Sequence, residues 1–87
     1  MSKKEAELAA QTKALPDIFD GRIPAADLAG LRSMAGGGEW GELLDLLVAV
    51  LHSNRVPVST AEIDDLREVL SGWGLPTDAL AGLIVRE

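Results

Sequence analysis

Apolar residues recur along this chain at the three- and four-residue spacings of amphipathic helices. Proline, glycine and capping residues divide the pattern into five segments. The most hydrophobic segment, residues 39–53, is predicted to be a central helix with one broad apolar face: Trp40, Leu43, Leu44, Leu47, Val48 and Leu51. Its opposite face is a narrow outward stripe: Glu42, Asp45, Ala49 and His52. We therefore expect this helix to be buried on most sides.

The first segment has a weaker pattern. A helix is predicted over residues 2–14, with Ser2 as its N-cap and Pro16 ending it, because proline removes a backbone donor. Its apolar face is thin and consists mainly of Leu8 and Leu15. We expect this helix to fray more than the others.

A connector over residues 16–23 carries the turn signal Asp20-Gly21. The second helix is then predicted to start at Pro24, a favourable first-turn residue, and to end at the glycine triplet 36–38. Three of its residues should face the core: Leu28, Leu31 and Ala35.

The fourth segment has the strongest local signal in the chain. Ser59 and Glu62 form a capping box, which predicts a helix starting at Thr60 and ending near Gly72 or Gly74. Its inner stripe is Ile63, Leu66, Leu70 and Trp73. Both tryptophans, Trp40 and Trp73, are interpreted as core residues in preference to partner contacts. Asp64, Asp65, Arg67, Glu68 and Ser71 face outward.

A fifth helix is predicted after Thr77, which would be its N-cap, through residues 78–85. Three of its side chains should pack on the bundle: Leu80, Leu83 and Ile84. The predicted fold is all-α, a small compact bundle of four to five short helices. We expect residues 1–87 to form a single domain, with a frayed helix over 1–14 and a core bundle over 15–87.

Composition and charge restrict the function. The chain has 87 residues, no cysteine and a net charge of −6, so it should repel phosphate backbones and attract basic proteins. The N-terminus lacks the apolar stretch of a secretory signal, and the longest apolar run, residues 46–51, is too short to cross a membrane. We expect a cytoplasmic protein that binds neither nucleic acid nor membrane.

Residue patterns for catalysis are lacking. His52 is the only histidine, the glycine triplet is not followed by the Lys-Ser or Lys-Thr of a phosphate-binding loop, and no Asp-Ser pair could carry an acyl carrier's prosthetic group. No catalytic, cofactor-binding or metal-binding residues are predicted, and His52 is interpreted as a surface residue. The protein is predicted not to be an enzyme.

Two groups of carboxylates stand out instead. One group is Glu39, Glu42 and Asp45, and the other is Asp64, Asp65 and Glu68. Acidic faces keep small domains soluble, and they can also dock a basic protein. If the third and fourth helices pack antiparallel, the two groups could flank a common edge.

Four stretches resemble the MafI-type immunity proteins of bacterial polymorphic and contact-dependent inhibition toxin systems, over about residues 19–85. They are Gly38-Glu39-Trp40 before an apolar helix, Val56-Pro57-Val58, the run from Ser59 to Leu66, and the run from Leu75 to Leu80. The resemblance implies a cytoplasmic protein that binds and neutralises the toxin domain of a cognate effector, often a nuclease. The six carboxylates would then face toxin lysines and arginines. The alternative is a small acidic adaptor or subunit of a larger complex unrelated to toxins.

Overall fold

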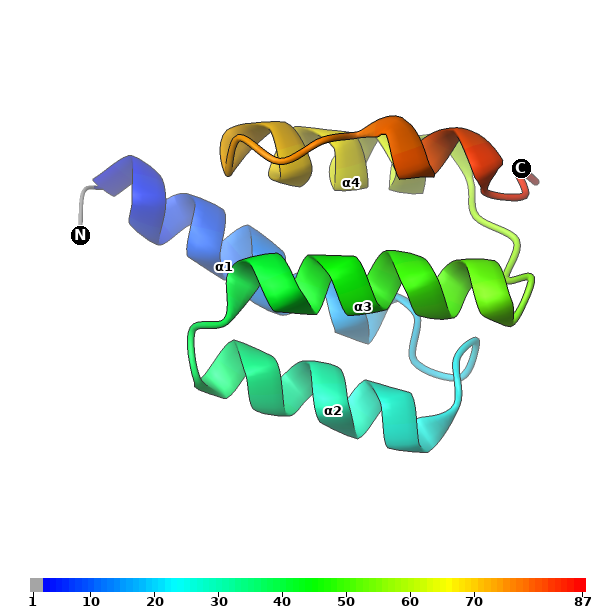
Figure 1. Cartoon of the computed structure of the whole chain (residues 1–87), viewed down its shortest axis with the longest axis horizontal. Coiled ribbons are helices and arrows are strands. Elements are labelled where there is room, and N and C mark those ends of the chain that lie inside the picture. Colours follow the sequence, from blue (N-terminus) through cyan, green and yellow to red (C-terminus); the bar gives the residue numbers. More distant parts are fainter. Residues whose placement is uncertain (1–2) are drawn as a thin grey trace.

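Four α-helices surround one hydrophobic core in the computed structural model, which describes residues 3–87 (Figure 1). The helices are α1 (Lys3–Ile18), α2 (Ala25–Gly36), α3 (Trp40–Ser53) and α4 (Thr60–Gly72), followed by a short 3-10 helix, η1 (Asp78–Gly82). The predicted class, a small all-α bundle, is confirmed. The only β-type pairing within the described residues is one isolated parallel bridge between Val58 and Val85.

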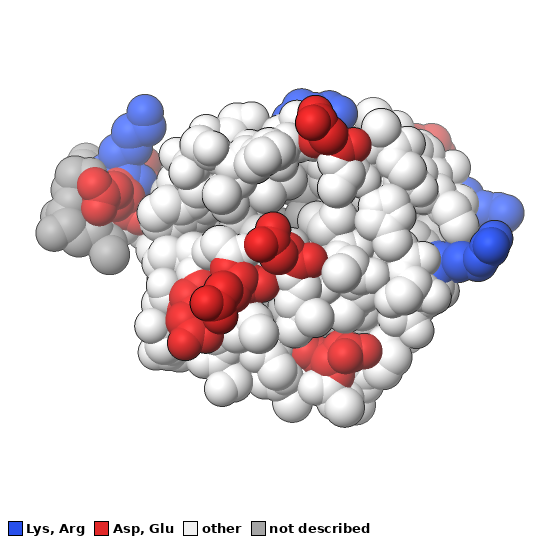
Figure 2. Space-filling view, viewed as in Figure 1, with Lys and Arg blue, Asp and Glu red and all other residues white. Residues whose placement is uncertain are grey.

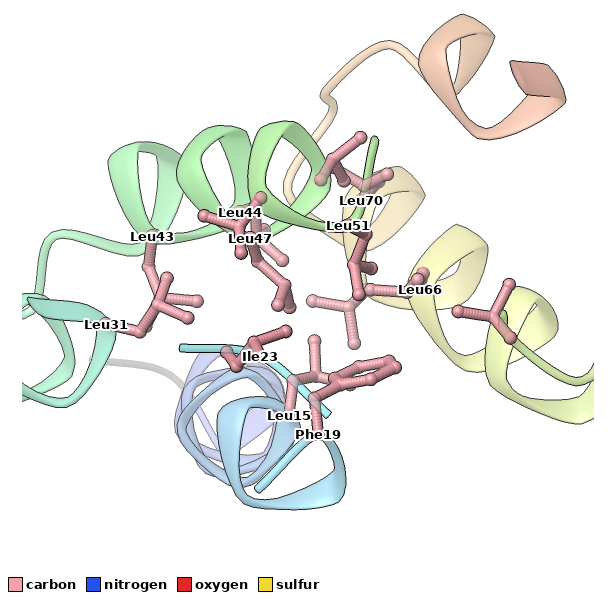
Figure 3. Close-up of a cluster of buried hydrophobic side chains, with 14 of the residues drawn as sticks. Leu15, Phe19, Ile23, Leu31, Leu43, Leu44, Leu47, Leu51, Leu66 and Leu70 are labelled. Carbon is pink, nitrogen blue, oxygen red and sulfur yellow. The ribbon is translucent and has the colours of Figure 1, made fainter. Parts of the chain in front are cut away.

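Helix α3 lies at the centre of the bundle. It runs antiparallel to α2 on one side and to α4 on the other, and α1 crosses behind it (Figure 1). Leu43, Leu44 and Leu47 are completely buried, because their side chains meet those of the neighbouring helices in the core (Figure 3). The predicted outward stripe is exposed at all four positions: Glu42, Asp45, Ala49 and His52. The predicted outer face is therefore confirmed, and the predicted inner face is buried except at Trp40, which is half-exposed.

The predicted end of the first helix is wrong. Helix α1 continues through Pro16 to Ile18, so part of the expected connector is helical. Proline removes one hydrogen bond from the helix and its ring crowds the carbonyl one turn earlier, but here the ring is fully buried. Phe19, with no exposed surface, follows directly and anchors the end of the helix in the core. Tertiary burial thus outweighs the local stop signal. The predicted N-cap, Ser2, lies outside the described residues.

The predicted starts of the other three α-helices agree with the structure to within one residue. At α4 both halves of the capping box are present. The Ser59 hydroxyl accepts a 3.1 Å hydrogen bond from the Glu62 N–H, and the Glu62 carboxylate accepts a 2.9 Å bond from the Ser59 N–H. The Asp20-Gly21 turn also forms, with Gly21 at a φ of 84° that favours glycine.

The predicted fifth helix is also wrong in its second half. Only Asp78–Gly82 is helical, as a 3-10 turn, and the chain is then extended. Val58 donates to the Ile84 carbonyl at 2.8 Å, and Arg86 donates to the Val58 carbonyl at 2.8 Å. The β-branched pair Ile84-Val85 suits this extended pairing better than a helix. Leu80 and Leu83 are buried as predicted, whereas Ile84 is only half-buried and Thr77 makes no side-chain cap.

The two tryptophans join the start of α3 to the end of α4. Their rings are stacked, with centroids 6.3 Å apart and planes 13° from parallel. Both side chains pack against the core while remaining half-exposed. The Trp73 indole N–H donates to the Thr12 hydroxyl at 2.9 Å, which connects this pair to α1. The tryptophans therefore belong to the edge of the core.

Candidate protein-binding surface

All six carboxylates that were predicted to contact a partner are exposed: Glu39, Glu42, Asp45, Asp64, Asp65 and Glu68. Their positions follow from the helix faces, since Glu39 is the N-cap of α3 and the two apolar stripes turn inward. On the face where α3 lies in front, acidic side chains form several separate groups divided by uncharged surface (Figure 2). This face of the molecule is therefore not one continuous acidic patch.

Five of the six carboxylates have no ion-pair partner among residues 3–87. The exception is Asp64, whose carboxylate lies 3.6 Å from the Arg67 guanidinium one turn further along α4. The other salt bridges of the described chain use Arg22 with Glu62, and Arg32 with Asp17 and Asp20. The α3 group and the Asp65–Glu68 pair therefore keep their charge available to an external cation.

The two acidic groups lie beside different hollows. Asp45 lines a hollow of about 200 Å³ between α3 and the segment after α4, where Val48, Leu70 and Pro76 also contribute. Asp65 and Glu68 instead line a hollow of about 230 Å³ between α4 and α1. We call the second hollow the α1–α4 groove; its walls are Gln11, Ala14, Leu15, Ile18, Asp65, Glu68 and Val69. Asp45 and the Asp65–Glu68 pair thus do not share a hollow.

His52 has a structural contact that the sequence did not reveal. Its ring is exposed, as predicted, but Nε2 lies 2.7 Å from the Ala79 carbonyl oxygen, within hydrogen-bonding distance. Gly82 makes room for the ring, because a Cβ at this position would lie 2.7 Å from His52 Cε1. His52 therefore connects the end of α3 to η1. In the sequence, only Gly82 indicates this contact, because a glycine inside a predicted helix can mark a close approach by another group.

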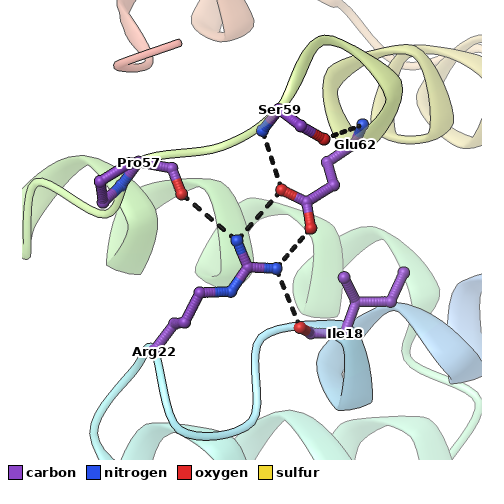
Figure 4. A network of polar contacts seen from close by, with 5 residues as sticks. All are labelled: Ile18, Arg22, Pro57, Ser59 and Glu62. Atoms are coloured by element: carbon purple, nitrogen blue, oxygen red, sulfur yellow. Dashed lines mark hydrogen bonds and ion pairs between the residues drawn. The ribbon is translucent and has the colours of Figure 1, made fainter. Parts of the chain in front are cut away.

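Arg22 was not singled out from the sequence, yet it organises the largest polar network of the described chain (Figure 4). Its guanidinium forms two parallel hydrogen bonds with the Glu62 carboxylate and donates to the carbonyls of Ile18, at 3.0 Å, and Pro57, at 3.4 Å. It also lies 4.7 Å from the centroid of the Phe19 ring. One side chain thus joins the end of α1, the link before α4 and the capping box.

The same network controls the electrostatics of Glu62. The hydrogen bonds from Arg22 hold the pKa of the Glu62 carboxyl below its ordinary value, and the Ser59 N–H adds to this effect. The pKa of Arg22 is raised in return by its bond to Glu62. Nearby, the Thr60 hydroxyl and N–H donate to the Glu87 carboxylate and lower its pKa. These carboxylates are already used in holding the fold together.

Within residues 3–87, no three side chains of the metal-binding types come together in a group that could hold an ion. No helix in the same range combines the length and the hydrophobicity needed to cross a bilayer.

Comparison with known proteins does not add a family. The chain matches no model of a protein family, no curated protein and no solved structure. The geometry of its own surface therefore carries the functional argument.

Proposed function

We propose that this protein is a cytoplasmic immunity protein that binds the toxin domain of a cognate bacterial effector and neutralises it in a stoichiometric complex. The observation that carries the proposal is the set of exposed carboxylates without an ion-pair partner in residues 3–87: Glu39, Glu42, Asp45, Asp65 and Glu68. The motifs around Trp40, Val56 and Ser59 that resemble MafI-type immunity proteins support the same reading.

Charge explains why such a surface suits a nuclease toxin. A nuclease presents lysine and arginine side chains to its phosphate substrate, so an inhibitor with a net charge of −6 is attracted to the same side chains. Complementary charge raises the association rate steeply at low salt, whereas desolvated apolar contacts set the lifetime of the complex. A binding surface that combines free carboxylates with exposed apolar side chains would serve both requirements.

The direct test is growth rescue. Each candidate toxin domain encoded next to this chain is expressed alone and together with it, and growth and complex formation are measured. Rescue together with a one-to-one complex on size-exclusion chromatography supports the proposal. A stable complex with a neighbouring protein that is not toxic would contradict it and favour the role of an adaptor in a larger assembly.

Two variants can show whether the association rate depends on net charge alone or on where the carboxylates lie. The triple variants Glu39→Gln/Glu42→Gln/Asp45→Asn and Asp64→Asn/Asp65→Asn/Glu68→Gln each remove three negative charges from the same total of −6. If docking is local, one triple variant should slow association at least about fivefold more than the other at low salt. Equal slowing by both would show that only net charge matters. Circular dichroism of both variants checks that folding is retained.

A further inference from the structure

The α1–α4 groove has an apolar floor and an acidic rim. Ala14 and Ile18 of α1 and Val69 of α4 form its apolar part, and Asp65 and Glu68 stand on the α4 side. Ile18 is 40% exposed and is one of only two large hydrophobic residues in the described chain with so much accessible surface. Such a hollow, apolar at its floor and charged at its rim, can receive the apolar side chains of an amphipathic partner.

The groove continues along α1 towards its N-terminus. A second hollow, of about 230 Å³, shares Gln11 and Glu68 with the groove and adds Glu7, Leu8 and Gly72. At Gly72 the floor is backbone, and a Cβ there would lie 2.8 Å from Leu8 Cδ1. From Leu8 to Ile18 the groove follows α1 for about 15 Å, at the rise of an α-helix. This length accommodates about three turns of a docked helix.

The acidic residues around the groove indicate what kind of ligand it can bind. Glu7, Asp65 and Glu68 border the two hollows, and none of them has an ion-pair partner among the described side chains of residues 4–87. Lys4 is the only basic residue that lines either hollow, and it lies at the far end. A phosphate-bearing ligand would be repelled, and a second copy of this chain would bring the same acidic excess. An apolar stripe flanked by lysine or arginine matches both the floor and the rim.

We propose that the α1–α4 groove docks a basic amphipathic helix of a protein partner, with apolar side chains against Ala14, Ile18 and Val69 and cationic side chains against Asp65 and Glu68. This inference rests on the proposed function, since the partner is the toxin domain proposed above. It places the docked helix of that partner in the groove and not at the acidic group on α3. It also names the chemistry that a toxin domain has to present.

The test uses the full chain and a synthetic probe, so it does not depend on any toxin. The probe is a 14-residue peptide of leucine, alanine and lysine whose leucines follow three- and four-residue spacing, and the control is a scrambled peptide of the same composition. Titration is followed by nuclear magnetic resonance of the labelled protein. We expect saturable shifts at Ala14, Ile18 and Val69 with the amphipathic peptide. Equal binding of the scrambled peptide, or shifts centred on α3, would overturn the proposal.

Matched variants sharpen the result. Asp65→Asn/Glu68→Gln should weaken peptide binding about three- to tenfold, whereas Asp27→Asn/Asp78→Asn, which removes the same charge outside the groove, should change it less than about twofold. Ile18→Ser should weaken binding, whereas Val85→Ser, at the other exposed large hydrophobic residue, should not. Equal losses in either pair would contradict docking in the groove. If the groove variants bind normally while toxin rescue persists, the groove assignment fails and the immunity function stands.

Discussion

At the scale of single residues, one buried hydroxyl connects α1 to the C-terminal end of α4. Thr12 is completely buried and is the only polar residue in the buried core of the described chain. Its hydroxyl donates to the Leu8 carbonyl at 2.8 Å and accepts from the Trp73 indole N–H at 2.9 Å. Because Trp73 stacks on Trp40, this hydroxyl fixes the position of the tryptophan pair relative to α1.

Thr12→Val should lower the free energy of unfolding by about 1 to 2 kcal/mol, because it preserves shape but leaves the Trp73 N–H without its acceptor. Urea denaturation followed by tryptophan fluorescence measures the change. Thr77→Val is the matched control, since Thr77 makes no side-chain capping bond, and it should stay within about 0.5 kcal/mol of the parent. Equal effects of the two substitutions would show that the buried hydrogen bond contributes little.

At the scale of elements, two helices contain glycines that lower their stability. Helix α2 contains Gly30 in its interior, where a Cβ would meet no atom within 4 Å. At the end of α4, a Cβ on Gly72 would instead lie 2.8 Å from Leu8 Cδ1. Both glycines weaken their helices. Only at Gly72 does a neighbouring side chain occupy the place of a Cβ, so only there does packing require glycine.

Gly30→Ala should raise the free energy of unfolding by about 0.5 to 1 kcal/mol, because alanine loses less backbone entropy on folding and nothing obstructs its methyl group. Thermal unfolding should show a midpoint several degrees higher, on the order of 4 to 8 °C per kcal/mol for a domain of this size. Gly72→Ala serves as the comparison, and its gain should be reduced or reversed by the contact with Leu8. A larger stabilisation at position 72 than at position 30 would contradict the packing of α1 on α4.

At the scale of the whole molecule, Arg22 joins segments that are distant in sequence. Its guanidinium binds carbonyls of Ile18 and Pro57 and the carboxylate of Glu62, so α1, the link and α4 meet at one charge (Figure 4). A carboxyl whose pKa is lower in the folded than in the unfolded chain stabilises the fold above its unfolded pKa. That contribution is lost as the pH falls through the folded pKa.

The free energy of unfolding should therefore decrease as the pH falls below the ordinary glutamate value of 4.5, in part because Glu62 takes up a proton and loses its bonds to Arg22. Glu62→Gln keeps a side chain that completes a capping box but removes the charge, so its stability should be lower at pH 7 and should depend less on pH. Urea denaturation between pH 3 and 7 measures both. Arg22→Gln should flatten the curve similarly, and curves parallel to that of the parent would exclude this ion pair as a source of acid sensitivity.

For the six carboxylates, the sequence predicts exposure but not their positions relative to one another. Exposure of Glu42, Asp45, Asp65 and Glu68 followed from the helical period, because an apolar stripe that turns inward leaves the opposite side in solvent. Whether the two groups meet depends on the rotation of each helix and on its neighbours. Packing places Asp65 and Glu68 beside α1 and Asp45 beside the segment after α4, and no local pattern contains that information.

Four features could be read from the chain alone, because they depend on periodicity and on contacts within a few residues: the helical class, the central position of α3, the capping box at Ser59 and the exposure of the acidic residues. Three other features depend on how the helices pack: α1 passes through Pro16, residues 84–86 pair with Val58 instead of forming a helix, and Arg22 joins three segments. In each case burial and long-range hydrogen bonds outweigh local propensities, which reach about 1 kcal/mol for most residues and about 3 kcal/mol for proline in a helix. The α1–α4 groove likewise depends on packing, since it exists only where two helices that are distant in sequence lie against each other.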